Sequence, residues 1–322
     1  MATCAFCDAS FETGPGDVLL VCPYCGTAQT KEGDKFKEHY MVRVHFDQTD
    51  AQTTLLDWVS KQLGAPEDLA TQAAFINYKL HFYPMWVSRV DSHSTYQGYG
   101  RDANFYDEWP QRRGAYKRID FFHKPESGQF TRRHEVVIPG MNNLDEDVRN
   151  HPIPTRAKEY FSHAHAEEHD GVVHHSQITE PQAREMAKNR AYELQTALIL
   201  SEITNIENRQ DDINVGETYL IHVPVWELVY RYGNGKYNAS VAAATGYVIE
   251  SKYPRSRAFR AMGMGFGFLS LIIGAALIAL ALNILGIQYF PGGGLVAGGM
   301  LAVLGLILIY KGASRKEAKE AL

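Results

Sequence analysis

The sequence contains little cysteine and no surplus of positive charge. Only 4 of its 322 residues are Cys, and 32 Lys and Arg residues stand against 37 Asp and Glu residues, for a formal net charge of −5. So few cysteines exclude a small secreted scaffold held together by many disulfides. The acidic balance argues against a dedicated DNA-binding surface, which is usually basic. With 45% hydrophobic and 21% charged residues, the chain is not a disordered polymer, and its length suggests about two domains.

Several sequence signatures are also missing. The first residues, Met1 to Cys7, have neither a basic start nor an apolar run, so we expect no signal peptide. The chain has no G-x-x-x-x-G-K-[ST] phosphate-binding loop, which argues against a nucleotide-driven helicase. It also has no G-x-S-x-G nucleophile elbow, so a serine hydrolase of that class is not indicated.

The four cysteines form two pairs at the start of the chain. They are Cys4-x-x-Cys7 and Cys22-x-x-Cys25, with 14 residues between the pairs. Two such knuckles are typical of a tetrahedral Cys₄ zinc site, in which protein sulfurs fill every position and none is left for substrate. The spacing therefore predicts a zinc ribbon over residues 1–33 with one structural Zn²⁺. A redox dithiol or an iron–sulfur site is the alternative.

The charge of this ribbon indicates what it contacts. Residues 1–30 contain Asp8, Glu12 and Asp17 but no Lys or Arg. Phosphate contacts need Lys and Arg, so nucleic acid is disfavoured as a partner. We expect the ribbon to contact protein.

The C-terminal region contains two long uncharged runs. Residues 261–287 and 289–310 have no charged side chain, and about 20 apolar residues suffice to span a bilayer. We predict two transmembrane helices within 257–312, followed by a cytoplasmic tail at 313–322. A buried helical hairpin in a soluble protein is the alternative. Basic residues flank the pair and are missing between the runs: Lys252, Arg255, Arg257, Arg260, Lys311, Arg315, Lys316 and Lys319.

This charge pattern predicts that both termini lie in the cytoplasm, at the inner face of the plasma membrane. Within the runs, Gly263 and Gly267 are four residues apart, as are Gly294 and Gly298. Small residues at this spacing let helix backbones approach closely. We favour packing within the hairpin over self-association. A transporter is not indicated, because neither run contains an acid or a base.

Two segments between ribbon and membrane resemble each other. Leu80–Val87 and Leu220–Glu227 share Leu, Pro and Trp at an offset of 140 residues. Each follows a helical pattern and precedes β-rich sequence. We therefore predict an α+β fold with two related helix-plus-β-meander modules, at 36–150 and 151–256.

The expected helices are Thr53–Leu63, Pro66–Tyr78 and a third from Pro181 to about Arg209, whose apolar positions include Met186 and Tyr192. The expected strands are Leu80–Val90, Thr95–Tyr99, Tyr116–His123, His134–Ile138, Tyr219–Tyr232, Tyr237–Ala243 and Tyr247–Tyr253, with a hairpin turn at Gly233-Asn234-Gly235.

The order of these motifs resembles the TFIIB-type zinc-ribbon membrane proteins, which are often labelled primosomal protein N′-like or helicase-like. The resemblance implies a membrane-anchored adaptor, with stomatin-like or phage-shock-type membrane-stress assemblies as partners. The matching residues are Cys4, Cys7, Cys22, Cys25, Pro84, Trp86, Tyr96, Gly98, Pro224, Trp226, Lys236, Tyr237, Thr245, Gly246 and Val248.

A histidine-rich segment at 163–175 is the one candidate for catalysis. Its residues His165-x-x-Glu168-His169 match the inverted-zincin pattern H-x-x-E-H, in which two His bind zinc and the Glu acts as base. Because Asp170-Gly171 follows at once, we expect the helix to end at the motif. The favoured interpretation is a solvated connection between the modules, with a labile metal site or a pH-responsive patch as alternatives.

Basic pairs interleaved with aromatic residues could touch RNA or anionic lipid, but an exposed sheet face is the simpler interpretation. They are Arg112-Arg113, Lys117-Arg118 and Arg132-Arg133. Taken together, the sequence predicts a membrane-anchored zinc-ribbon adaptor that recruits protein partners and contacts membrane lipid, with no catalysis expected. A membrane-bound metalloprotease and a nucleic-acid-binding protein are the alternatives.

Overall fold

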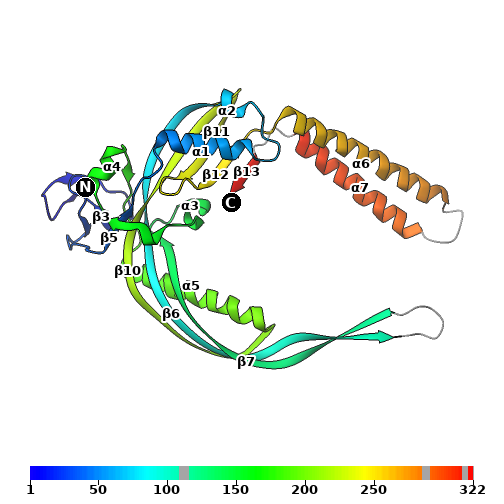
Figure 1. Cartoon of the computed structure of the whole chain (residues 1–322), viewed down its shortest axis with the longest axis horizontal. Coiled ribbons are helices and arrows are strands. Elements are labelled where there is room, and N and C mark those ends of the chain that lie inside the picture. The colour runs from blue at the N-terminus through cyan, green and yellow to red at the C-terminus, as the bar shows by residue number, and fades with distance from the viewer. Residues whose placement is uncertain (109–115, 285–290, 314–317, 322) are drawn as a thin grey trace. The chain divides into compact units, whose positions relative to one another are not determined.

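The computed structural model describes residues 1–108, 116–284, 291–313 and 318–321. Over these residues the chain has an α+β fold, as the sequence predicts. It contains a nine-stranded, largely antiparallel sheet and two separate two-stranded ribbons (Figure 1). The chain divides into two compact units, residues 1–43 with 81–224 and residues 44–80 with 225–322. Strands β6 (Ala74–Glu108) and β10 (Asn205–Tyr232) belong to both.

The first unit holds the cysteine hairpins and one long antiparallel pair. β6 pairs with β7 (Tyr116–Pro139) in an unbroken register from Met85↔Pro139 to Glu108↔Tyr116. Within this unit β10 pairs in parallel with β5 along Leu220–His222. The short elements are β1 (Ala2–Thr3), β2 (Ser10–Phe11), β3 (Leu19–Val21), β4 (Ala28–Thr30), β5 (His39–Val42), α3 (Glu146–Asn150), the 3₁₀ turn Thr155–Ala157, β8 (Lys158–Tyr160), α4 (His163–Glu168) and β9 (Val172–Val173).

The prediction of separate strands at Leu80–Val90 and Thr95–Tyr99 was wrong, because β6 continues through the polar residues between them. Three of the four side chains, those of Asp91, His93 and Ser94, find partners on other strands. Asp91 pairs with Arg133 at 2.7 Å, and Ser94 donates a hydrogen bond to Asp211 at 2.5 Å. A polar stretch therefore need not end a strand when neighbouring strands satisfy its side chains.

Helix α5 (Glu180–Glu202) packs on this unit through alanine. It begins with a capping box in which Thr179 and Gln182 each accept a backbone N–H of the other. Its buried stripe is Ala183, Ala187, Ala191, Gln195 and Ile199. The three alanines pack with Trp86, Val90, Val136 and Ile138, and Ile199 packs with Tyr96.

Two expectations about this helix were wrong. Met186 and Tyr192 are exposed, because small side chains on the other face let the helix lie close to the sheet. The helix also ends at Glu202 rather than near Arg209, since Ile203 is already extended and β10 begins at Asn205.

The second unit contains a β-meander covered by a helix. The expected hairpin is confirmed, with Tyr232 of β10 opposite Gly235 of β11 (Gly235–Ala242) and Gly233 at a φ of 56°. β12 (Val248–Tyr253) pairs with β11 and with β13 (Ala318–Ala321), and α1 (Gln48–Ser60) buries Ala51, Leu55 and Val59.

The helix predicted over Pro66–Tyr78 was wrong. α2 (Leu69–Gln72) is one turn long, and β6 begins at Ala74. The sequence from Ala74 to His81 alternates in a way that suits a strand, with aromatic and β-branched residues.

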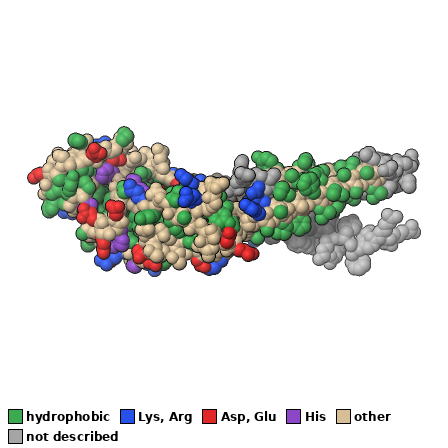
Figure 2. Space-filling view, turned by 90° about the horizontal axis from the view of Figure 1, so that it is seen from above, with side chains coloured by type: hydrophobic (Ala, Val, Ile, Leu, Met, Phe, Trp, Pro, Cys, Tyr) green, Lys and Arg blue, Asp and Glu red, His purple; other side chains and the backbone are tan. Residues whose placement is uncertain are grey.

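Helices α6 (Arg257–Ile284) and α7 (Pro291–Ala313) pack against each other within this unit. Of the described helices, only α6 has a stretch, Arg257–Leu280, that is long and apolar enough to cross a membrane. The apolar part found in α7, Val296–Tyr310, is shorter. Residues 285–290, between the two helices, lie outside the described residues. Hydrophobic side chains gather on the outer surface of the pair (Figure 2), among them Phe266, Phe268, Ile272, Met300, Val303 and Leu306.

Glycines bring these two helices into backbone contact. A Cβ on Gly267 would lie 2.8 Å from the Gly305 carbonyl oxygen, and one on Gly274 would lie 2.8 Å from that of Gly298. Ser270 donates a hydrogen bond to Leu301 O at 2.8 Å. Of the four glycines singled out in the sequence, Gly267 and Gly298 lie at these contacts, which supports a role in packing between the two helices.

We predict that Gly267→Leu separates the helices, because a side chain there has no room. Overpacking of this kind costs about 1–3 kcal/mol. Thermal unfolding in detergent, followed by circular dichroism, measures the loss. Gly265→Leu on the same helix is the matched control, since a Cβ there meets nothing within 4 Å. Equal unfolding temperatures for the two variants would contradict the packing interpretation.

Candidate metal centre

The four cysteines lie in two short turns, each at the end of a hairpin. Cys4 and Cys7 follow β1, which pairs with β2 through Ala2↔Phe11. Cys22 and Cys25 follow β3, which pairs with β4 through Val21↔Ala28. The strands are two or three residues long, so strand pairing within the two hairpins contributes little to the geometry of the turns.

The two turns make the same hydrogen bonds. In the first, the Cys4 N–H donates to Ala9 O at 2.9 Å and the Asp8 N–H donates to Cys4 O at 3.0 Å. The residue after each second cysteine is left-handed, Asp8 at φ 59° and Gly26 at φ 71°, a conformation that Gly and Asp tolerate better than other residues. In the second turn, the Cys22 N–H donates to Thr27 O at 3.0 Å and the Gly26 N–H donates to Cys22 O at 2.9 Å.

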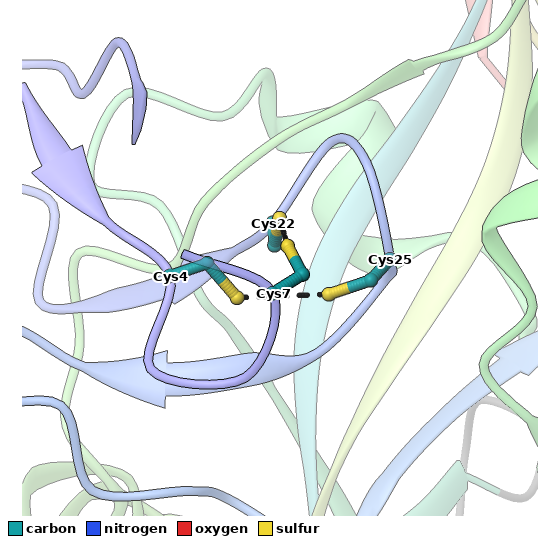
Figure 3. Close-up of side chains that lie close together, drawn as sticks. All are labelled: Cys4, Cys7, Cys22 and Cys25. Atoms are coloured by element: carbon teal, nitrogen blue, oxygen red, sulfur yellow. Dashed lines mark hydrogen bonds between the residues drawn. The ribbon is translucent and has the colours of Figure 1, made fainter. Parts of the chain in front are cut away.

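The sulfur atoms converge from both turns (Figure 3). Cys4 Sγ lies 3.6 Å from Cys25 Sγ, Cys7 Sγ lies 3.7 Å from Cys22 Sγ, and all four lie within 4.8 Å of one another. Four sulfurs at 2.3 Å around a tetrahedral zinc would be about 3.8 Å apart. The arrangement can therefore hold a metal ion, and zinc fits its donors and its size.

Backbone N–H groups point at the sulfurs. Phe6 N–H donates to Cys4 Sγ and Tyr24 N–H to Cys22 Sγ, both at 3.4 Å. Burial raises the pKa of Cys22 to about 12. Burial acts in the same direction on Cys25, but hydrogen bonds with Thr27 and with the Cys7 and Cys4 sulfurs together outweigh it and lower the pKa of Cys25 to about 7. Since a metal binds thiolates, it must displace the remaining protons.

Gln29 and a small apolar cluster support the turns from behind. The Gln29 side chain is 1% exposed, accepts the Ala5 N–H at 2.8 Å and donates to Thr3 O at 2.9 Å, so it ties the first turn to β4 of the second hairpin. The cluster consists of Cys4, Phe11, Leu20 and Cys22.

The cysteine hairpins are attached to the rest of the first unit at Ser176. Its backbone pairs with β3, with Ser176 N–H donating to Leu19 O at 3.0 Å and Val18 N–H donating to Ser176 O at 2.8 Å. The neighbouring His175 accepts the Val21 N–H on Nδ1 at 3.2 Å. The second cysteine hairpin is therefore held in place by main-chain hydrogen bonds to Ser176 and one bond to the His175 side chain.

A group of four contacting histidines, of which His39 and His222 are buried, lies in the same unit and was missed by the sequence analysis. His222 Nε2 faces His174 O at 2.9 Å and must donate to it, which leaves His222 Nδ1 to accept from His39 Nε2 at 2.9 Å. His81 Nδ1 lies 2.8 Å from His174 Nε2. His222 interrupts the apolar stretch 219–226 of β10, and His39 begins the otherwise buried strand β5, which was the available signal.

The histidine-rich segment divides into two parts. His165, Glu168 and His169 come together at α4, with ligand atoms within 4.8 Å of one another. His174 and His175 instead make the structural hydrogen bonds described above. Of the basic pairs, Arg133 binds Asp91, whereas Arg112 and Arg113 lie outside the described residues.

Comparisons with known protein families, curated proteins and solved structures find no match to this chain. The resemblance to the TFIIB-type zinc-ribbon membrane proteins stays an interpretation of the motifs.

The buried histidines predict a loss of stability in mild acid. Burial lowers the pKa of His222 to about 4, and burial with the neighbouring His222 lowers that of His39 well below its ordinary value. The unfolded chain, with His pKa near 6.5, binds more protons below that pH. Stability should therefore fall as the pH drops from about 6.5 to about 4, by on the order of 3 kcal/mol for His222 alone.

Denaturant unfolding at pH 7 and pH 5 measures this effect. His222→Gln should reduce the difference between the unfolding free energies at the two pH values. His93→Gln, at an exposed position of β6, should leave that difference as in wild type. The same difference in all three proteins would show that other groups cause the acid sensitivity.

Proposed function

We propose that this chain is a zinc-ribbon adaptor anchored in a membrane, which recruits a protein partner through the tip of its ribbon. The observation that carries the proposal is a pair of exposed aromatic residues at equivalent positions of the two turns. Phe6 is 63% exposed and Tyr24 is 65% exposed, and each lies two residues after the first cysteine of its turn. Exposed aromatic residues on a rigid support are enriched at protein interfaces.

Zinc would be structural in this proposal. Cys4, Cys7, Cys22 and Cys25 would fill all four positions, so no site remains for a substrate. The ion would fix the two turns relative to each other and thereby hold Phe6 and Tyr24 in place. Lys35 lies over the Phe6 ring at 4.3 Å from its centroid, so one positive charge lies beside this surface.

Membrane anchoring is supported by α6 and by its partner helix. The exposed apolar surface of the pair has no cover in the chain, as far as the structure describes it, and lipid would provide one. We propose that both helices cross the inner membrane, with Arg255, Arg257 and Arg260 at the cytoplasmic end of α6 and Lys311 near that of α7. Both termini and the ribbon would then be cytoplasmic.

We predict that the protein stays in the membrane pellet after an alkaline wash and is released by detergent. A reporter fused at the C-terminus should report the cytoplasm, as should one at the N-terminus. Release by the alkaline wash would contradict the membrane anchor. Reporters on opposite sides of the membrane would mean that only one helix crosses it.

The recruitment surface predicts a separation of metal binding from partner binding. Phe6→Ala/Tyr24→Ala should keep one zinc per chain, because it leaves all four thiolates in place, and should lose the protein that co-purifies with the detergent-extracted wild type. Cys4→Ser/Cys22→Ser should lose both. Zinc analysis and mass spectrometry of the purified samples give the two readouts.

Leu63→Ala is the matched control, since Leu63 is an exposed hydrophobic residue outside the ribbon. It should retain both zinc and partner. If no protein co-purifies at stoichiometric amounts with wild type, or if the same protein remains with the Phe6→Ala/Tyr24→Ala variant, the ribbon tip is not a recruitment surface.

A further inference from the structure

Helix α4 places three potential metal ligands on one side of a single turn. His165 and Glu168 are three residues apart, and His165 and His169 are four apart, so their side chains share a face. The helix ends at this point, as the sequence predicts, but the ending does not disperse the group. His169 is the last residue before the break, and the break itself falls at Asp170, with φ 50°.

The face is held at both ends by buried contacts. Ala166 is fully buried, and Gly171 N–H donates to Ala166 O at 2.9 Å. A Cβ on Gly171 would collide with the Phe82 ring, so the chain leaves the helix pressed against β6. At the other end, the Cβ of His163 is 3.1 Å from where a Cβ on Gly26 would lie. The three ligands therefore sit on a helix that is positioned before any ion arrives.

The distances are close to those of a coordinated ion. His165 Nδ1 lies 3.5 Å from Glu168 Oε2, and the rings of His165 and His169 are nearly perpendicular, with centroids 5.0 Å apart. Ligands at 2.0–2.2 Å around a tetrahedral ion would be about 3.3 Å apart. The widest separation, 4.8 Å at most, has to close by about 1.5 Å to reach that value. The Glu168 side chain is 69% exposed, so solvent rather than packed protein surrounds most of it.

The charges around the group partly favour a cation. The positive charge of Arg43 lies near enough to interact electrostatically with His165, and it opposes the binding of a divalent cation there. Glu159 binds Arg43 Nε at 2.6 Å and offsets that charge. Glu168 supplies a negative charge within the group itself.

We propose that His165, Glu168 and His169 form a second metal site, separate from the cysteine centre, for a divalent first-row transition cation such as Zn²⁺, Co²⁺ or Ni²⁺. Two imidazoles and one carboxylate suit these ions better than Ca²⁺ or Mg²⁺, which prefer oxygen ligands alone. Three protein ligands leave at least one position for water. The site is therefore open and exchangeable, in contrast to four sulfurs that close the coordination shell.

Cobalt titration tests the proposal, because Co²⁺ bound to thiolates shows strong sulfur-to-metal charge-transfer absorption and Co²⁺ bound to nitrogen and oxygen does not. Full-length protein, purified in detergent through a histidine-free tag and treated with a mild chelator, is titrated with Co²⁺. One equivalent should bind without the thiolate absorption. If the cysteine centre is empty after purification, a further equivalent of Co²⁺ binds there and shows the thiolate absorption. The absorption therefore distinguishes the two sites, and the count at the histidine site does not depend on the zinc-ribbon proposal.

His165→Ala and His169→Ala should each weaken the non-thiolate equivalent by at least about 100-fold, since changes even outside the ligand set commonly cost about 10–100-fold. Glu168→Gln keeps the shape and removes the charged ligand, and it should weaken binding by about 10-fold or more. His93→Ala is the control and should bind as wild type. The circular dichroism spectrum checks that each variant is folded.

Two results would overturn the proposal. One is a wild type that takes up no cobalt beyond a thiolate-bound equivalent. The other is an undiminished non-thiolate equivalent in the folded His165→Ala and His169→Ala variants, which would place the ion elsewhere.

Discussion

The first unit depends on the hydrogen bonds of one buried residue, Ser176. Its backbone extends the second cysteine hairpin at Leu19, and its hydroxyl donates to Gly140 O or Ile178 O and accepts the Trp86 indole N–H at 3.2 Å. The segment around it, His174–Thr179, also supplies the carbonyl that fixes the His222 tautomer and the cap that starts α5. Ribbon, sheet, buried histidines and helix therefore meet within six residues of chain. In a low-dielectric interior such a network stabilises only when every member is satisfied.

This arrangement has a consequence for the metal centre. A zinc ribbon on a flexible linker would exchange its ion without disturbing the remaining protein. Here β3 is part of a main-chain ladder with Ser176, and His163 of α4 lies against Gly26 of the second turn. Rearrangement of the cysteine turns would change the contact of Gly26 with α4. Conversely, an ion at His165 and His169 would stabilise the helix that supports Gly26. The two proposed sites are therefore expected to influence each other's affinity.

Sequence reasoning predicted the features that depend on local chemistry. The cysteine spacing identified four sulfurs that the fold brings within 4.8 Å of one another. The Gly233-Asn234 sequence predicted the hairpin at that position, and the first uncharged run predicted α6. It failed where distant residues decide. β6 and β7 form 24 continuous residue pairs. The prediction broke these strands into shorter ones at polar residues whose partners lie on other strands. The alanine stripe of α5 was overlooked because small residues carry little hydrophobic signal. The contact of His39 with His222 joins residues 183 positions apart, which no local pattern reveals.

The glycine contacts between α6 and α7 determine how this pair can respond to its surroundings. Gly267 meets Gly305 and Gly274 meets Gly298, two contacts that are two helical turns apart on α6. Because both contacts would have to break together, neither helix can slide along the other by a fraction of a turn. If both helices cross a bilayer as proposed, the pair would respond to a change in hydrocarbon thickness by tilting as one body. Bilayer thickness would then set the angle at which the pair, and the chain leading into Arg257, meets the membrane surface.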